Sequence, residues 1–487
     1  MTKVASSGMN RRAFIGAATA SALLAAGGSS FFSASAAQRR RPNILFILAD
    51  DLGWADISVY GRPYYGQAAY LTPNIDRLAS QGTRFPNSYA NQTVCTPTRV
   101  AFYTGRYSAR TDVGLREPLA NIAEVGQTVG LPPDQPTIAS LLDAQGYETA
   151  LVGKWHAGYP PTYGPLVSGF GEYHGNYSGA IDYFTHKDGD GNLDFFEGTT
   201  PLDLAGYSTD LYTQQAIDFI TRSREKPFFL SLQYNASHWP WEGPEDEALS
   251  QTFYPTNPYT AGGSQETYAA ILNRLDEGIG RVLQALRDSG QEENTLVIFT
   301  SDNGGERYSL IGPFQGRKGS LYEGGIRVPT IIRWPGVVPP NKVSEQTIIT
   351  FDITATILAA ARTSPDPSSP LDGENLLPVI IGERSPYHRA LFWRYAGGAQ
   401  KAARSGKWKY LKIGDTEFLF DLSTDTEETT DLQSSNPQIL SQLRDTFAQW
   451  ESGVLPYPPE LIPPTPPSPS AALGIPAAPG VPTAPTI

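Results

Sequence analysis

Cysteine is nearly absent from this sequence: Cys95 is the only one in 487 residues, beside two methionines and five histidines. Without a second cysteine the chain forms no intramolecular disulfide. Zinc is disfavoured as well, because clustered His and Cys ligands are missing. We interpret a residue type that is used once, just before a helical pattern that starts with proline, as a chemical group. Cys95 is therefore a candidate nucleophile.

Positive charge is also in short supply. The chain has 37 Lys and Arg against 49 Asp and Glu, a net charge of -12. This balance argues against nucleic acid as a partner, and it means that the overall field does not attract an anionic substrate. Any positive potential has to be local. The 40% apolar and 11% aromatic content is that of a globular protein with a sizeable core.

Long apolar runs are missing too, since no segment after the N-terminus approaches the roughly 20 residues that span a bilayer. Residues 1–37 instead predict an export signal, with the twin arginines Arg11 and Arg12, a weakly apolar stretch, and an Ala-Ser-Ala cleavage site at 34–36. We expect the twin-arginine translocase to export the folded protein to the periplasm or beyond. Insertion of a cofactor, or modification of Cys95, would then be completed in the cytoplasm before export.

Four predicted strands each end in polar residues. Asn43–Ala49 precedes Asp50 and Asp51, and the other three are 148–153, 227–234 and 295–301, followed by Lys154-Trp155-His156, Asn235-Ala236-Ser237-His238 and Asp302-Asn303. Helical patterns separate them, which predicts an α/β fold with a large, mainly parallel sheet sandwiched by helices. Such sheets bind ligands at the carboxyl ends of their strands. The sequence therefore predicts one polar site at this edge.

The adjacent carboxylates of Asp50 and Asp51 indicate a divalent cation, because two buried acids repel each other unless positive charge lies between them. The alternative is that one acid caps the turn at Leu52-Gly53 and the other is solvated. His156 and His238 taken singly are as well explained as structural residues. Asp302 and Asn303 taken alone also fit an ordinary turn.

Cys95 should lie at a helix N-terminus. Pro97 suits the first turn of a helix and Gly105 suits its end. Backbone N–H groups and the positive end of the helix dipole would then face whatever binds there, which favours an anion.

The pattern Cys95-Thr96-Pro97-Thr98-Arg99, with Thr-Gly-Arg at 104–106, resembles the signature of type I sulfatases of the alkaline-phosphatase-like superfamily. Thr96 and Thr98 stand where the family commonly has serine. The segment Gly316-Arg317-Lys318-Gly319 resembles the sulfatase segment that carries a substrate-contacting lysine. Other segments that resemble the family occur in the same order as in the family over roughly residues 42–432.

The resemblance implies an enzyme that hydrolyses sulfate monoesters after a formylglycine-generating enzyme has converted Cys95 to Cα-formylglycine. It implies an all-oxygen metal shell of Asp50, Asp51, Asp302, Asn303 and the modified Cys95, for Ca²⁺ first and Mg²⁺ second. Arg99, together with the cation, would polarise the attacking oxygen, and Lys154 and Lys318 would hold the sulfate oxygens. His238 with Lys318 would protonate the leaving oxygen, and His156 would take a proton to regenerate the aldehyde.

Other functions stay open from the sequence. A phosphate or phosphonate monoester hydrolase of the same superfamily would suit the same ligands. A thiolate phosphatase fits poorly, because its Cys-x5-Arg loop needs arginine where Ala101 stands. In an exported binding protein without catalysis, Cys95 would be an inert apolar residue.

The aromatic loops at 61–70, 111–135, 159–174 and 239–263 suit sugar and aryl rings alike. An exported enzyme meets sulfated glycans more readily, so we expect a carbohydrate sulfate as substrate, with small aryl sulfates accepted as poorer substrates.

The remaining chain divides at a turn-rich connector, residues 363–370. We expect a catalytic domain at 42–370 and a small antiparallel-sheet domain at 371–454. Residues 455–487 are rich in Pro and Ala, which predicts a disordered tail or a strap over the body. Residues 188–194 hint at a calcium loop, but Leu193 stands where glycine is needed, so a hairpin turn is the better interpretation. His174, His186 and His388 receive no role.

Overall fold

The structure is a computed structural model that describes residues 40–120, 128–252 and 262–484. The chain divides into Met1–Arg40 and Arg41–Ile487, and the fold below is that of the second unit. The expected export signal lies outside the described residues. Among the described residues, no helix is both long enough and apolar enough to cross a membrane.

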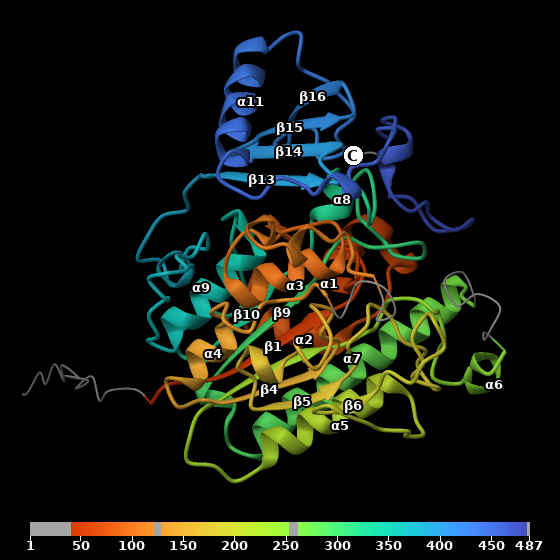
Figure 1. Ribbon diagram of the computed structural model, residues 1–487, viewed down its shortest axis with the longest axis vertical. Helices are drawn as coiled ribbons and strands as arrows, with labels where there is room; N and C mark the ends of the chain where they lie inside the picture. The colour runs from red at the N-terminus through yellow and green to blue at the C-terminus, as the bar shows by residue number, and fades with distance from the viewer. Residues whose placement is uncertain (1–39, 121–127, 253–261, 485–487) are drawn as a thin grey trace, which may run out of the picture. The chain divides into compact units, whose positions relative to one another are not determined.

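A ten-stranded sheet forms the centre of the fold, in the order β11-β2-β10-β9-β1-β8-β4-β5-β6-β7 (Figure 1). Its four middle strands are parallel: β9 (Thr295–Ser301), β1 (Asn43–Ala49), β8 (Phe228–Gln233) and β4 (Glu148–Gly153). They are the four strands that the sequence predicts, and the predicted fold class is confirmed.

Short strands complete the edges of this sheet. β5 (Glu172–Gly175) pairs parallel with β4, while β10 (Ile331–Arg333) pairs antiparallel with β9. The others are β2 (Thr83–Arg84), β6 (Phe196–Glu197), β7 (Thr200–Pro201) and β11 (Lys342–Val343). A separate two-stranded sheet joins β3 (Ser88–Tyr89) to β12 (Ile348–Ile349).

Helices cover both faces of the central sheet, and β1 shows why this is stable. Leu45 and Ile47 pack into the core on one face, and Ile44, Phe46 and Leu48 pack into the core on the other. The first core is covered by α2 (Pro73–Ser80), α5 (Ser208–Thr221) and α7 (Gln265–Asp288), and the second by α3 (Cys95–Thr104), α4 (Ile138–Asp143) and α9 (Thr350–Ala360). Each fully buried side chain of this kind contributes about 1.5–3 kcal/mol.

The C-terminal part builds an antiparallel sheet of β13 (Ala390–Tyr395), β14 (Gln400–Ser405), β15 (Trp408–Ile413) and β16 (Thr416–Asp421), with α11 (Pro437–Glu451) against it. The smaller helices are α1 (Ser58–Tyr65), α6 (Glu247–Ser250), α8 (Glu323–Ile326) and α10 (Leu377–Ile380). The sequence does not predict β14, because Gln-Lys-Ala-Ala-Arg-Ser has no β-branched or aromatic residue. Pairing with both neighbours makes it a strand.

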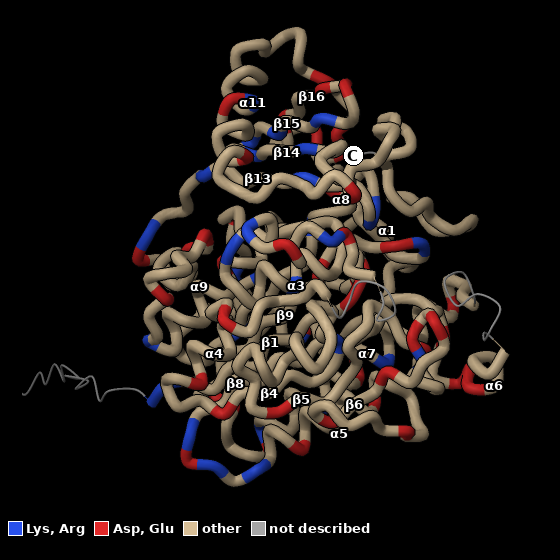
Figure 2. The backbone as a smooth tube through the Cα atoms, in the orientation of Figure 1, with Lys and Arg blue, Asp and Glu red and all other residues tan. Residues whose placement is uncertain are grey.

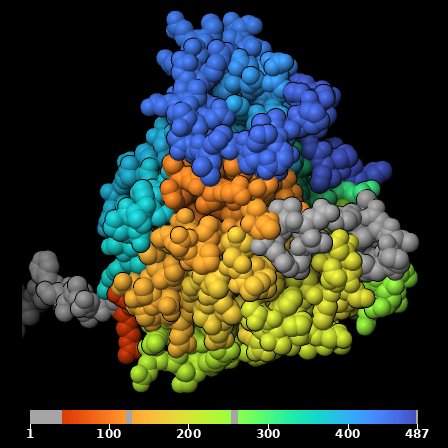
Figure 3. Space-filling view, in the orientation of Figure 1, coloured from red at the N-terminus to blue at the C-terminus, as the bar shows by residue number. Residues whose placement is uncertain are grey.

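Residues 455–484 of the Pro-rich tail lie against the body. Leu455 N donates to Ala109 O at 3.0 Å, and Ala478 N donates to Arg307 O at 2.9 Å. Ala472 is buried in the core beneath the C-terminal sheet. In Figure 3 the end of the tail rests against the green segment near residue 310. Of the two predicted alternatives, the structure therefore shows a tail that lies over the body.

A buried ion network joins the C-terminal sheet to α8. Lys409 Nζ on β15 lies 2.9 Å from Glu323 Oε1 on α8 and 2.8 Å from Glu428 Oε1, and all three side chains are buried. Glu323 also accepts from Tyr89 Oη at 2.5 Å.

The central strands β1 and β9 have no charged residue, and Figure 2 shows charges of both signs mainly on the outer helices and loops.

Lys409→Ala should lower the free energy of unfolding by about 3–5 kcal/mol, because it leaves Glu428 buried without its cation and Glu323 with Arg327 as its remaining ion-pair partner. Lys407→Ala is the matched control: Lys407 pairs with Asp421 at 2.5 Å, but its side chain is 50% exposed. This exposed pair should contribute less than about 1 kcal/mol. Urea denaturation of both variants measures the difference, and equal losses would contradict a stabilising network.

Candidate active site

The ends of the parallel strands bring the candidate residues to one edge of the sheet. Asp50 and Asp51 follow β1, Asp302 follows β9 and Lys154 follows β4. The pairing of Leu48 with Gln233 on one side and Thr300 on the other keeps these ends level. All four side chains are buried, with at most 1% of their surface exposed.

Arg99 is the cation at the centre of this edge. It lies one turn into α3, and its Nη2 is 2.9 Å from Asp302 Oδ2 and 3.5 Å from Asp50 Oδ2. Its Nη1 donates to Lys154 O at 3.0 Å and to Gln233 Oε1 at 2.7 Å. Arg99 thereby links α3 to β1, β4, β8 and β9.

The two adjacent carboxylates each form an ion pair with a lysine. Lys154 Nζ lies 2.5 Å from Asp50 Oδ2, and Lys318 Nζ lies 2.6 Å from Asp51 Oδ2. Asn303 Nδ2 donates to Asp51 Oδ1 at 2.7 Å. Lys318 comes from an irregular loop far along the chain, so the loop and the strand ends face each other across this site.

Cys95 begins α3, with Gly105 in the left-handed conformation at the end of the helix. Its thiol is buried, and ligand atoms of Asp50, Asp51, Cys95 and His238 all lie within 4.8 Å of one another. His238 Nε2 is 3.5 Å from Asp51 Oδ2, and its Nδ1 is 2.7 Å from Trp239 O. The thiol thus lies beside the carboxylates at the positive end of a helix.

His156 lies at the same edge, two residues after Lys154. Its Nε2 is 3.0 Å from Leu119 O, and its buried Nδ1 has no hydrogen-bond partner among the described residues. His156 and Asp51 both have positive φ, 49° and 58°, although neither is glycine. Such strain of about 1–3 kcal/mol per residue clusters at functional sites, where the surrounding structure holds it.

Burial and neighbouring charge set the ionisation of these groups. Burial, together with Asp302, raises the pKa of Asp50 to about 8. Burial also opposes the charge of Asp51, yet Lys318 and His238 hold the pKa of Asp51 well below its usual range. Burial and Lys154 lower the pKa of His156, and burial and Lys318 lower the pKa of His238. Both imidazoles therefore favour the neutral form: His156 in that form can accept a proton, whereas His238 has to be protonated before it can give one up.

The oxygen atoms of this site suit a hard cation. Asp50 Oδ1 and Asn303 Oδ1 are buried and have no hydrogen-bond partner among the described residues. Unpaired buried oxygens are costly, and in this position a cation would satisfy them. The donor set of carboxylate and amide oxygens is the kind that Ca²⁺ and Mg²⁺ prefer.

The sequence interpretation missed three residues of this edge. Gln233 accepts from Arg99 and from Tyr103 Oη at 3.1 Å. Glu306 is buried, and its Oε2 lies 3.5 Å from Lys318 Nζ. Thr93 Oγ1 accepts from Gly319 N at 2.9 Å. A polar residue at the end of the apolar run 228–233 is a signal that could have identified Gln233.

Comparison with known proteins identifies the chain's relatives. The family model "Sulfatase" matches residues 42–363. The chain belongs to the sulfatase family. A second model, "N-sulphoglucosamine sulphohydrolase, C-terminal", matches residues 314–452 of this sulfatase.

Individual relatives support the assignment. This sulfatase is 34% identical to N-acetylgalactosamine-6-sulfatase of Homo sapiens over 389 residues, covering 76% of this chain and 71% of that protein. It is 31% identical to arylsulfatase A of Bos taurus, covering 84% and 87%. Among solved structures, Ps i-CgsB in complex with k-i-k-neocarrahexaose has a TM-score of 0.73 at 30% identity and covers 84% of this chain and 93% of that chain. The protein is a sulfuric ester hydrolase, and sulfate monoesters are its substrate class.

Proposed function

We propose that this sulfatase hydrolyses carbohydrate sulfates through a formylglycine derived from Cys95, with a divalent cation held by Asp50, Asp51, Asp302 and Asn303. The observation that supports it best is the gathering of Cys95, Asp50, Asp51 and His238 within 4.8 Å at the strand ends. Arg99, Lys154 and Lys318 contact the same carboxylates. The site thus joins a single reactive residue to a set of fixed positive charges.

The cation in this proposal is Ca²⁺, with Mg²⁺ second, because the donors are all hard oxygens. Asp50 Oδ1 and Asn303 Oδ1, which accept no hydrogen bond from any described residue, are the positions open to it. A bound cation supplies a Lewis acid that polarises the reacting oxygen and stabilises negative charge. Asp50, Asp51, Asp302 and Asn303 would hold it, together with the modified residue 95.

Formylglycine at position 95, when hydrated, would supply two hydroxyls: a nucleophile for the ester sulfur and a second hydroxyl whose deprotonation would let sulfate leave. Lys154 and Lys318 would hold the sulfate oxygens as point charges, over which the transition state spreads negative charge. Arg99 keeps Asp302 and Asp50 in place and lowers the energy of negative charge at the N-terminus of α3.

The two histidines would move the protons. His238, with Lys318, gives a proton to the leaving alcohol oxygen, and His156 takes the proton of the second hydroxyl. Their positions agree with these roles: His238 lies next to Asp51 and Cys95, while His156 Nδ1 is free of hydrogen bonds within the described parts of the chain. The low pKa of His156 leaves it neutral and able to accept a proton.

The sugar preference rests on the relatives and on the expected place of action. One relative is named N-acetylgalactosamine-6-sulfatase, and one structural neighbour was solved in complex with k-i-k-neocarrahexaose. The export signal proposed for residues 1–37 would bring the enzyme through the twin-arginine translocase to sulfated polymers outside the cytoplasm. A formylglycine-generating enzyme would act on Cys95 before export.

The domain division in this proposal is catalytic residues 42–370, a small domain at 371–454 and the strap-like tail from 455. A phosphate or phosphonate monoester hydrolase is not favoured, because the two relatives named above, at 34% and 31% identity, are sulfatases.

Removing the cation should abolish turnover. After chelation and desalting, Ca²⁺ should restore activity and, at one hundred times its dissociation constant, should stabilise the folded state by about 2.7 kcal/mol. Asn303→Ala should weaken this Ca²⁺-dependent rise in melting temperature, because one oxygen donor is lost. Elemental analysis of desalted active protein reads the ion directly; stoichiometric zinc without calcium or magnesium would refute the assignment.

Cys95→Ser should lower multiple turnover of 4-nitrophenyl sulfate by at least about 1,000-fold. Its hydroxyl can attack sulfur, but it has no second hydroxyl to eliminate sulfate, so a sulfated serine should accumulate and appear by mass spectrometry. In the unaltered protein the peptide that contains residue 95 should carry an aldehyde. An unmodified thiol in active protein, or rapid turnover by the serine variant, would disprove the mechanism.

Sulfated mono- and oligosaccharides should give higher kcat/KM values than 4-nitrophenyl sulfate, and 4-nitrophenyl phosphate should give a lower value than the matching sulfate. The panel measures the substrate preference directly. If every sugar falls below the aryl ester, the enzyme is an arylsulfatase proper. If the phosphate is the better of the two nitrophenyl esters, the runner-up function is correct.

A further inference from the structure

The Pro-rich tail pairs with the loop that carries Lys318. Arg317 N donates to Leu473 O at 2.9 Å, and Ile475 N donates to Lys318 O at 3.0 Å. These two backbone hydrogen bonds lie on either side of Gly474. Neither family model extends to this segment, since the models match residues 42–363 and 314–452. The tail side of this pairing therefore lies outside the matched regions, and the Lys318 loop lies inside them.

The opposite side of the same loop is held by the core of the site. Lys318 N donates to Gly305 O at 3.1 Å, and Gly319 N donates to Thr93 Oγ1 at 2.9 Å. Thr93 lies two residues before Cys95. The backbone of Lys318 is thus enclosed between the Cys95 segment and the tail, and its own N–H and C=O are both engaged.

Gly474 makes this close contact achievable. Its φ is +80°, and a Cβ at this position would lie 2.4 Å from Lys318 O and 2.6 Å from Arg317 O. Both are backbone atoms, so a side chain here would push the tail off the loop. Gly480 has a nearly equal φ of +85°, yet a Cβ there would meet nothing within 4 Å. The two glycines share a left-handed φ that would strain any other residue, and they differ in the contact that a Cβ would make.

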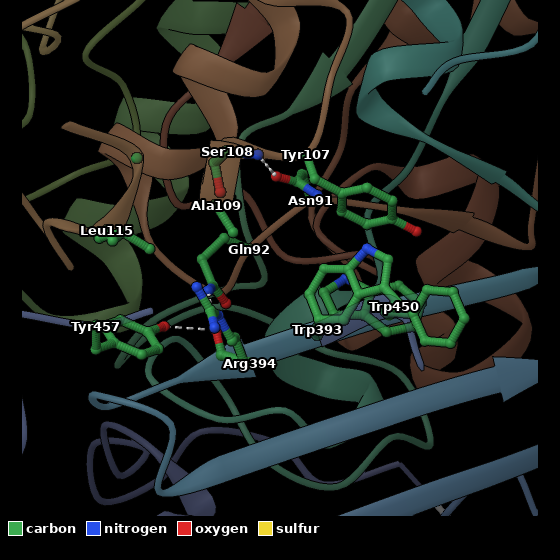
Figure 4. Close-up of a pocket in the computed structure, with 12 residues that line it drawn as sticks. Asn91, Gln92, Tyr107, Ser108, Ala109, Leu115, Trp393, Arg394, Trp450 and Tyr457 are labelled. Atoms are coloured by element: carbon green, nitrogen blue, oxygen red, sulfur yellow. Dashed lines mark hydrogen bonds between the residues drawn. The ribbon is translucent and has the colours of Figure 1, made fainter. Parts of the chain in front are cut away.

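The tail is anchored before and after this contact. Tyr457 Oη donates to Arg394 O at 3.1 Å and to Glu117 Oε1 at 2.5 Å, and Figure 4 shows Tyr457 beside Arg394 in a pocket that Gln92 also lines. Further on, Ala472 is buried in the core beneath the C-terminal sheet, and Ala478 is buried in a core of the central sheet. The segment between them runs along the Lys318 loop and forms two backbone hydrogen bonds with it.

We propose that residues 472–478, here named the strap, position Lys318 for catalysis, an inference that rests on the proposed role of Lys318 in holding sulfate. Lys318 Nζ lies 2.6 Å from Asp51 Oδ2 while the Lys318 backbone is held between Gly305 O and Ile475 N. A displacement of about 1 Å at such a group costs roughly 100-fold in rate. The strap therefore acts through Lys318, as a positioning element supplied from the end of the chain.

Gly474→Ala should lower kcat/KM for 4-nitrophenyl sulfate at least about tenfold, mainly in kcat, and raise the inhibition constant of inorganic sulfate, because Lys318 is displaced. Gly480→Ala is the matched control and should stay within about twofold of the unaltered enzyme in both constants. If Gly474→Ala lowers only the melting temperature while the folded protein keeps its kcat/KM, the strap is merely structural and the proposal is wrong.

Hydrogen exchange gives a readout that does not depend on activity. In Gly474→Ala, and in a variant that ends at Pro466, the Arg317 amide loses its acceptor and should exchange at least about tenfold faster. Gly480→Ala should leave the exchange rate of this amide unchanged. Unchanged exchange and kcat/KM in both variants would overturn the strap. If the unaltered protein fails to hydrolyse any sulfate ester, the proposed function fails, and the Arg317 exchange still decides whether the tail orders the Lys318 loop.

Discussion

Balanced burial of charge at the carboxyl ends of β1, β4 and β9 is the constraint on which the rest of the structure depends. Asp50, Asp51 and Asp302 are fully buried, and Arg99, Lys154 and Lys318 lie against them. A buried carboxylate without a partner would cost several kcal/mol, so each acid requires its cation in place. The strands, α3 and the Lys318 loop therefore have to come together as one unit.

The same balance explains how an acidic protein can act on an anion. With Glu306 included, four acids face three bases at the site, so a divalent cation on Asp50 Oδ1 and Asn303 Oδ1, which have no hydrogen-bond partner in the described part of the chain, would change a formal charge of about -1 into a local positive excess. The N-terminus of α3 adds to it. The net charge of -12 is carried mainly on outer helices and loops, where water screens it.

The C-terminal part contributes to the site through contacts with α8 and the Lys318 loop. Lys409 and Glu428 hold Glu323 at the start of α8, five residues after Lys318. Gln400 Nε2 donates to Gly319 O at 3.2 Å. The Lys318 loop is thus held by contacts with the C-terminal sheet, with the core of the site and with the tail. Such support is suited to a lysine that has to be positioned to within about 1 Å.

The sequence by itself determined the strands β1, β4, β8 and β9 and the polar residues that follow them, because an apolar run closed by charged residues is a local signal. It also determined α3, through Pro97 and Gly105. Only the tertiary structure decided what depends on pairing between distant segments. β14 is a strand because its neighbours complete its hydrogen bonds, and Gln233 and Glu306 belong to the site because Arg99 and Lys318 reach them. The tail became a strap because Gly474 lets its backbone approach Lys318, a contact that composition rich in proline and alanine does not encode.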